Sequence, residues 1–107
     1  MPWYDYLAHF MGGAMLVNAV PHFVQGICGA RFQSPFASPP GVGESGPLVN
    51  VIWGLANFAV AAALLLAVGP LDLHQPTDWG LAAAGGVLTA IGLAAHFGRV
   101  RSSRSGG

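Results

Sequence analysis

The stretch Leu48–Val68, LVNVIWGLANFAVAAALLLAV, contains no charged residue, and Asn50 and Asn57 are its only amides. Such a run is typical of a helix that crosses a bilayer, because about 20 apolar residues of helix span the hydrocarbon core. The whole chain of 107 residues has the same character, since 53% of them are hydrophobic and only 7% are charged. Soluble domains carry about 25% charged residues, so the composition predicts a membrane protein.

Two further segments, residues 3–28 and 78–98, are also long and apolar enough to span. A cytoplasmic loop rich in proline and glycine, residues 29–47, separates the first two spans, and a short turn-rich segment precedes the third. The spans are thus expected at about 3–28, 48–68 and 78–98, with a tail at 99–107. We therefore expect an all-α membrane protein, with three transmembrane helices in a compact bundle that forms a single domain over residues 1–107.

The charged residues predict the orientation of the spans. The basic residues all fall in the loop or after the third span, which must share a face: Arg31, Arg99, Arg101 and Arg104. The N-terminus and the second connection carry acidic residues instead: Asp5, Asp72 and Asp78. Because basic residues are enriched in cytoplasmic segments, we expect the N-terminus outside and the C-terminus in the cytoplasm.

Small residues predict where the spans approach one another. Helices in lipid associate through close packing and hydrogen bonds rather than through the hydrophobic effect. The glycines expected at helix contacts are Gly12, Gly13, Gly54, Gly85, Gly86 and Gly92.

Polar side chains inside the spans form the candidate site. Asn18, His22 and Gln25 share one face of the first span by their spacing, and Pro21 removes a backbone donor and should kink the helix there. The order of the spans brings the end of the first, the start of the second and the end of the third to the same depth, whereas His9 lies in the other half. We expect one polar cluster at that depth, formed by Asn18, His22, Gln25, Asn50, Trp53, Asn57 and His96.

Three uses of this cluster are open. Its amides and histidines could simply join the helices, or they could line a pocket for a lipid head group, a quinone or another small amphiphile. A third use is the binding of haem b, with His22 and His96 as the two axial ligands. Proton-coupled transport lacks its usual feature, because no carboxylate lies inside a span.

Catalytic chemistry finds no support in the sequence. The carboxylates are all expected in loops or at span ends: Asp5, Glu44, Asp72 and Asp78. No paired acids, no metal-ligand cluster and no nucleophile with a matching base are visible. The 4 basic and 4 acidic residues balance, so no basic surface for nucleic acid is expected.

The residues around the loop resemble a known family. The pattern comprises Pro21-His22-Phe23, Gly26, Gly29, residues 32–37 (FQSPFA), Pro39-Pro40-Gly41, Gly43, Pro47, Val49-Asn50, Trp53-Gly54 and Asn57. It is similar to that of small bacterial integral membrane proteins of unknown function. The resemblance implies a multi-pass protein of the bacterial inner (cytoplasmic) membrane, and a loop that folds as a cap over the polar cluster.

These observations predict a non-catalytic protein that serves as an accessory or structural subunit of a larger membrane complex, or as a homo-oligomer. Its partners would be the lipid bilayer and other membrane subunits or further copies of itself. The alternative is a small-molecule binding or carrier protein that holds a lipid, a quinone or haem in the polar cluster.

Overall fold

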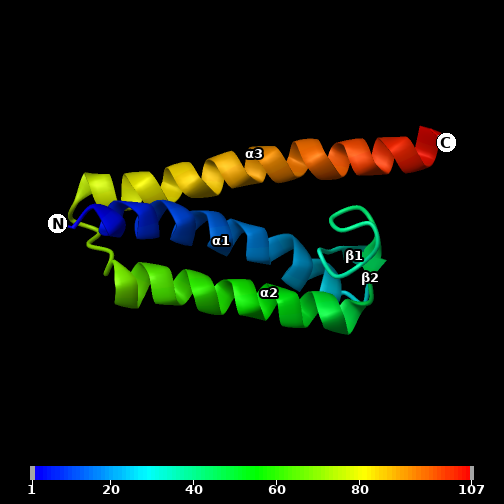
Figure 1. The fold of residues 1–107 in the computed structure, drawn as a ribbon, viewed down its shortest axis with the longest axis horizontal. Coiled ribbons are helices and arrows are strands. Elements are labelled where there is room, and N and C mark those ends of the chain that lie inside the picture. Colours follow the sequence, from blue (N-terminus) through cyan, green and yellow to red (C-terminus); the bar gives the residue numbers. More distant parts are fainter. Residues whose placement is uncertain (1, 107) are drawn as a thin grey trace.

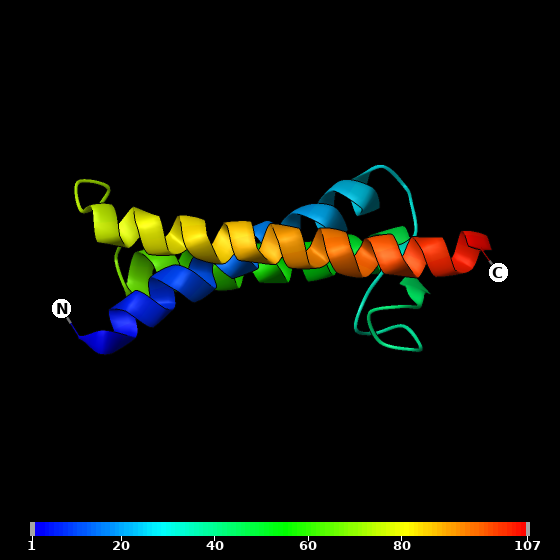
Figure 2. The ribbon, with the colours of Figure 1, turned by 90° about the horizontal axis from the view of Figure 1, so that it is seen from above.

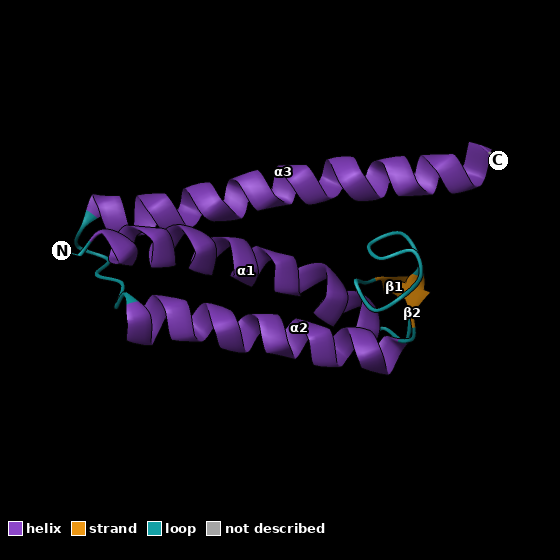
Figure 3. Ribbon diagram, viewed as in Figure 1, coloured by secondary structure: helices purple, strands orange, loops and turns teal. Residues whose placement is uncertain are grey.

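A computed structural model describes residues 2–106 of the chain, and the side chains as far as Ser103. It contains three long helices, α1 (Trp3–Ile27), α2 (Pro47–Ala62) and α3 (Pro76–Gly106), and a π-helical segment, η1 (Ala63–Val68), continues α2 (Figure 1). Two short strands, β1 (Phe32–Gln33) and β2 (Glu44–Ser45), lie in the loop between α1 and α2 (Figure 3). The predicted all-α fold with three helices is confirmed, and each helix is long and apolar enough to cross a membrane.

The helix boundaries follow the residues at the helix ends. Both α2 and α3 begin with a proline, Pro47 and Pro76, which suits the first turn because a backbone N–H there has no partner within the helix. We expected a separate tail from residue 99, but α3 continues to Gly106. Residues 99–105 contain neither proline nor glycine, so nothing in them ends a helix. Gly107 lies outside the described residues.

α1 is the central helix of the molecule. It packs against α2 on one side and α3 on the other, and these two flanking helices are separated by it (Figure 1 and Figure 2). The N-terminus and the turn after η1 lie at one end, which we call the N-terminal end (Figure 1). The strands and the end of α3 lie at the other, the loop end, where α3 diverges from α1 and the loop lies beside it (Figure 1).

Glycines allow the close approach of α1 to its two neighbours. A Cβ atom at Gly13 would overlap the carbonyl oxygen of Ala82, and one at Gly85 would overlap that of Phe10. Gly54 brings α2 against the backbone of Phe23, because a Cβ atom at Gly54 would lie only 2.8 Å from the Phe23 nitrogen. Backbones this close gain van der Waals contact that longer side chains would prevent.

The other predicted glycines divide into two groups. Gly12 lies against Leu65 of η1, and Gly86 lies against Val17 of α1, so both are contact positions as expected. The prediction for Gly92 is wrong, because no atom lies within 4 Å of the place where its Cβ would be. The reason is the divergence of α3, which has left α1 by the time the chain reaches Gly92.

The interior of the molecule is polar and its surface is apolar. The largest side chains that are fully buried are His9, Gln33, Ser34, Asn50, Asn57 and Asp78. The buried hydrophobic residues are small or few: Ala8, Ala19, Phe32, Ala61 and Val100. Large hydrophobic side chains are instead exposed along all three helices, among them Leu16, Val24, Ile52, Leu55, Val87, Leu88 and Ile91. This distribution is the reverse of that in a soluble domain.

Candidate functional site

Amide and imidazole side chains join α1 to α2 inside the molecule. His22 Nδ1 lies 3.0 Å from Asn50 Oδ1, and the amide nitrogen of Asn18 donates to Asn57 Oδ1 at 2.9 Å. Asn57 in turn donates to the carbonyl oxygen of Trp53 at 2.8 Å. Hydrogen bonds of side chains within α2 and between α1 and α2 therefore bring together five of the predicted cluster residues: Asn18, His22, Asn50, Trp53 and Asn57.

Asn50 connects this cluster to the loop. Its Nδ2 donates to three carbonyl oxygens, those of Phe32 (3.1 Å), Ser45 (3.1 Å) and Gly46 (3.2 Å). Because the amide nitrogen faces only acceptors, the amide oxygen must accept the bond from His22, and His22 Nδ1 carries the hydrogen. A neutral His22 then has a lone pair on its other ring nitrogen, Nε2.

The loop folds back on itself and on α3. β1 and β2 pair antiparallel, with Phe32 opposite Ser45 and Gln33 opposite Glu44. The tip of the loop reaches α3, where His96 Nε2 donates to the carbonyl oxygen of Gly41 at 2.7 Å. The loop thus contacts both Asn50 and His96. His96 joins the cluster through this loop, and its Nδ1 keeps a lone pair when the ring is neutral.

Aromatic rings fill the space between the loop and the helices. The Phe32 ring packs edge-on against Phe97 of α3, with 4.8 Å between centroids, and against His22 of α1, with 5.5 Å. Trp53 packs in the same way against Phe36 of the loop at 5.1 Å and lies 6.4 Å from the His22 ring. These contacts place Trp53 beside the cluster, as predicted.

A pocket of about 260 Å³ lies between α1, α3 and the loop, and we call it the loop-end pocket. Its lining residues are Asn18, His22, Gln33, Ser34, Pro35, Gly41, Trp53, Leu93, His96 and Phe97. Gln33 is fully buried, yet neither its Oε1 nor its Nε2 has a hydrogen-bond partner in the described residues. Gln33 was not among the predicted site residues, although it lies inside the pattern FQSPFA on which the resemblance rests.

Gln25 is the one predicted member that the structure leaves out. Its side chain is half-buried on α1 and makes no hydrogen bond with the residues that the structure describes. Gln25 also does not line the loop-end pocket. Its spacing from His22 places it one turn nearer the end of α1.

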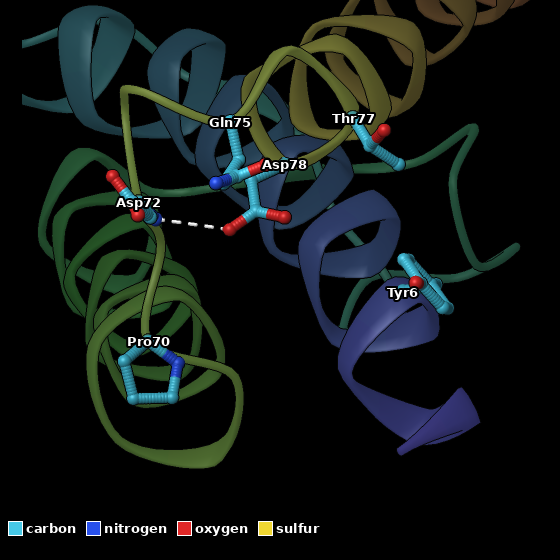
Figure 4. A pocket seen from close by; sticks show the side chains of 6 residues that line it. All are labelled: Tyr6, Pro70, Asp72, Gln75, Thr77 and Asp78. Atoms are coloured by element: carbon cyan, nitrogen blue, oxygen red, sulfur yellow. Dashed lines mark hydrogen bonds between the residues drawn. The ribbon is translucent and has the colours of Figure 1, made fainter. Parts of the chain in front are cut away.

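A second polar cluster, which was not predicted, lies at the N-terminal end. His9 is fully buried and its Nε2 donates to the carbonyl oxygen of Gly69 at 2.9 Å. Its other ring nitrogen, Nδ1, has no hydrogen bond and lies 3.7 Å from Oδ1 of the buried Asp78. The remaining carboxylate oxygen of Asp78 accepts the backbone N–H of Asp72 at 3.0 Å (Figure 4). We call these residues the Asp78 cluster.

The Asp78 cluster borders an open polar pocket of about 450 Å³. Figure 4 shows that its lining comes from the start of α1, the turn after η1 and the start of α3: Tyr6, Pro70, Asp72, Gln75, Thr77 and Asp78. A signal for this cluster was present in the sequence. The order of the spans brings the start of the first beside the start of the third, so a histidine and an aspartate there should meet.

Within residues 2–106 the structure groups no three histidine, cysteine, aspartate or glutamate side chains that could hold a metal ion. Comparison of the chain with protein-family models, curated proteins and solved structures finds no match. The resemblance to a family of small bacterial membrane proteins therefore stays a prediction, and function has to be argued from the geometry.

Proposed function

We propose that this chain is an integral membrane protein of the bacterial inner membrane that crosses the bilayer three times. The observation that carries the proposal is the inverted distribution of side chains, with a polar interior and an apolar surface. Soluble monomers rarely expose apolar patches beyond a few hundred Å². Lipid accounts for such a surface, and a length of 50 Å along the helices exceeds the ~30 Å hydrocarbon core.

The charges support an orientation with the N-terminus outside. The loop end carries Arg31, Arg99 and Arg101, whereas the N-terminal end carries Asp5, Asp72 and Asp78. Basic segments stay in the cytoplasm, so the loop end would face it. Trp3 and Trp79 are both exposed at the N-terminal end, where aromatic rings would meet the outer interface.

The lone cysteine offers a test of this orientation. Cys28 is exposed near the loop end, and exposed Leu73 lies in the turn at the opposite end. A membrane-impermeant maleimide should label the double variant Cys28→Ser/Leu73→Cys in intact cells. It should label the original chain at Cys28 only after the membrane is permeabilised. The opposite pattern would overturn the orientation.

Within the membrane, we propose that the protein acts without catalysis, as an accessory subunit of a larger complex or as a homo-oligomer. In the 18-residue apolar stretch of each span, only 33% (α1), 17% (α2 with η1) and 11% (α3) is buried inside the molecule. Most of each helix is therefore free to contact lipid or another chain. The two polar clusters lie at the ends and contain no nucleophile paired with a base, so binding and assembly fit the site better than bond-breaking chemistry.

Native mass spectrometry of the protein, purified in mild detergent, tests this role. An accessory subunit should appear together with other chains at a fixed stoichiometry, and a homo-oligomer should appear as a multiple of 11.0 kDa. A single copy without other chains, at every detergent concentration that keeps the protein folded, would overturn the proposal.

A second candidate function is the binding or transport of a small molecule in the loop-end pocket. One observation favours it, namely the buried amide of Gln33, which lines the pocket without a partner in the described residues. A polar group buried in this way costs about 1–3 kcal/mol, and a ligand could satisfy it. The pocket of about 260 Å³ is smaller than the ~300–1,000 Å³ of sites for drug-sized ligands, so its size favours a ligand smaller than haem b.

A further inference from the structure

The loop-end pocket has a buried polar floor, formed by His22, Gln33 and Ser34, while its other lining residues are half-buried or exposed. Two of the floor residues have partners. His22 is hydrogen-bonded to Asn50, and the hydroxyl of Ser34 is hydrogen-bonded to that of Ser45. Gln33 is 0% exposed, and neither its Oε1 nor its Nε2 has a partner among the described residues. The floor therefore presents an amide whose acceptor and donor are both free.

The amide of Gln33 indicates what kind of group would satisfy it. A primary amide carries a carbonyl acceptor and an N–H donor side by side. A group that engages both at once needs a donor beside an acceptor as well, and glutamine pairs in this way with the edge of an adenine base in DNA. A carboxamide has such an edge, whereas a carboxylate has acceptors only and an amidinium has donors only. Gln33 thus complements a neutral group of the amide type.

The rest of the wall offers donors and acceptors alike. The indole N–H of Trp53 and the second hydrogen of Asn18 Nδ2 are donors. The Nε2 of His22 and the Nδ1 of His96 are acceptors when the rings are neutral. The wall as a whole therefore tolerates a group with both functions, and the selection between ligands depends on the paired donor and acceptor of Gln33.

The pocket also limits the charge and size of a ligand. Its ten lining residues include no aspartate, glutamate, lysine or arginine, so an ion would lose its hydration without gaining a counter-charge. Trp53 and Phe97 supply flat apolar surfaces for a ring. An apolar cavity of about 150 Å³ binds benzene, so the pocket of about 260 Å³ has room for a single substituted ring.

We propose that the loop-end pocket binds a small uncharged ring compound that carries a carboxamide or a similar group with adjacent donor and acceptor. The N–H of this group would donate to Gln33 Oε1, and its carbonyl oxygen would accept from Gln33 Nε2. The ring would pack against Trp53 or Phe97. This inference rests on the second candidate function, the binding of a small molecule in this pocket, and names the class of its ligand.

Three probes of nearly the same shape test the ligand class: benzamide, benzoate and benzamidinium. The full-length protein is titrated with each of them in detergent at a pH of about 7, where the carboxyl group of benzoate is ionised. Benzamide is neutral and has the paired edge, whereas each ion lacks one half of it. Because a buried polar group left unpaired weakens binding, we expect benzamide to bind about tenfold more tightly than either ion, or more.

Binding can be observed on the side chains of the protein itself by nuclear magnetic resonance. The chain has three glutamines, Gln25, Gln33 and Gln75, and three tryptophans, so isotope-labelled glutamine and tryptophan give few and separable N–H signals. Of the glutamines, only Gln33 lines the loop-end pocket, and Trp53 is the tryptophan that lines it. Benzamide should shift the N–H signals of Gln33 and leave those of the other two glutamines in place.

Gln33→Met tests the site, because methionine has a similar length and no amide. It should weaken benzamide binding about tenfold, as read from the indole N–H signal of Trp53, and the thermal midpoint of the unliganded protein should stay the same or rise. Gln25→Met is the matched control, with the same change on α1 outside the pocket, and should leave the affinity unchanged. A merely structural Gln33 would raise the midpoint without changing the affinity.

Four results would each overturn the proposal. They are an ion that binds as tightly as benzamide, Gln33 signals that do not shift, unchanged affinity in Gln33→Met, and no binding of benzamide. If Gln33→Met does not fold, the three probes and the Gln33 signals of the original chain decide.

Native mass spectrometry separates failure of this proposal from failure of the function on which it rests. A small molecule of another class that stays bound to the original protein and is lost in Gln33→Met would refute the amide-type ligand and keep a binding function. A protein that carries no small molecule and binds none of the three probes would refute both.

Discussion

The two ends of the molecule bury polar side chains by different means. At the loop end, Asn50, His22, Asn18 and Asn57 connect α1, α2 and the loop through hydrogen bonds between groups without formal charge. At the N-terminal end, His9 faces the carboxylate of Asp78 across 3.7 Å. Matched amides keep their bonds whatever the protonation state, whereas the attraction of His9 to Asp78 requires a protonated ring.

The N-terminal end, which holds the buried carboxylate of Asp78, is also the end where α1 and α3 pack most closely. The N-terminal half is where α1 and α3 touch backbone to backbone at Gly13 and Gly85. At the loop end, the loop lies between α3 and the other helices, and its main-chain carbonyls take up the donors of Asn50 and His96. Three substitutions test whether the two ends really differ in this way.

Asn50→Leu should destabilise the protein most. The change removes the side-chain partner of the carbonyl oxygens of Phe32 and Ser45 and of the Nδ1–H of His22, whereas the carbonyl oxygen of Gly46 keeps the backbone N–H of residue 50. Buried groups left unpaired cost about 1–3 kcal/mol each, so we expect a loss of about 3 kcal/mol or more in a detergent unfolding titration. The released loop should also be cleaved faster by a non-specific protease between residues 34 and 46. Val49→Ala, at an exposed neighbouring position, is the control, and equal effects of the two variants would refute the role of Asn50.

Gly13→Ala should come next. Its Cβ would overlap the carbonyl oxygen of Ala82 on α3, and overpacking of this kind costs about 1–3 kcal/mol. Gly92→Ala is the matched control on α3, where no atom lies within 4 Å of the new Cβ. It should be neutral or stabilise by about 0.5–1 kcal/mol, because alanine is the better helix former. If thermal unfolding in detergent shows a similar loss for both, then α3 packs along its whole length.

Asp78→Asn should cost the least of the three. It keeps an oxygen for the backbone N–H of Asp72 but removes the charge that faces His9. A charge-assisted hydrogen bond is about twice as strong as a neutral one, so the weakened bond to the Asp72 N–H should cost about 1 kcal/mol in the free energy of unfolding, measured with the same titration. Asp72→Asn is the control, because the Asp72 side chain is exposed and accepts the local N–H of His74. Unchanged stability in Asp78→Asn would mean that both ends work as neutral hydrogen-bond clusters.

Much of the fold could be predicted from the sequence, because apolar length alone identifies the three helices in a chain with 7% charged residues. That His22 and Asn50 lie at one depth could also be predicted from the order of the spans, but their hydrogen bond is known only from the structure. Gly92 could not be placed in this way. Gly92 lies seven residues after Gly85, so the two share one helix face and both were expected to contact a neighbouring helix. The path of α3, however, depends on the space that the loop takes up beside it, and the spacing of residues in the sequence does not show this.

The loop and the Asp78 cluster show what else a sequence pattern leaves out. The residues around Gln33 identify a loop, but the burial of Gln33 depends on the pairing of β1 with β2 and on the position of α3 above them. His9 donates to Gly69, the residue that follows the π-helical segment η1, and an apolar run in the sequence does not predict such a local change in helical winding. The proximity of His9 to Asp78 could still have been predicted, since the order of the spans places both at the same end.

The loop acts as a spacer. It holds the end of α3 away from α1 through its contact from Gly41 to His96 and through the packing of Phe32 on Phe97. The width of the pocket is therefore determined by the loop residues 34–43, folded between the two strands, and not by the helices that form most of its wall. Shortening the loop would let α3 close on α1, and Gly92 would then become the packing glycine that its spacing suggests.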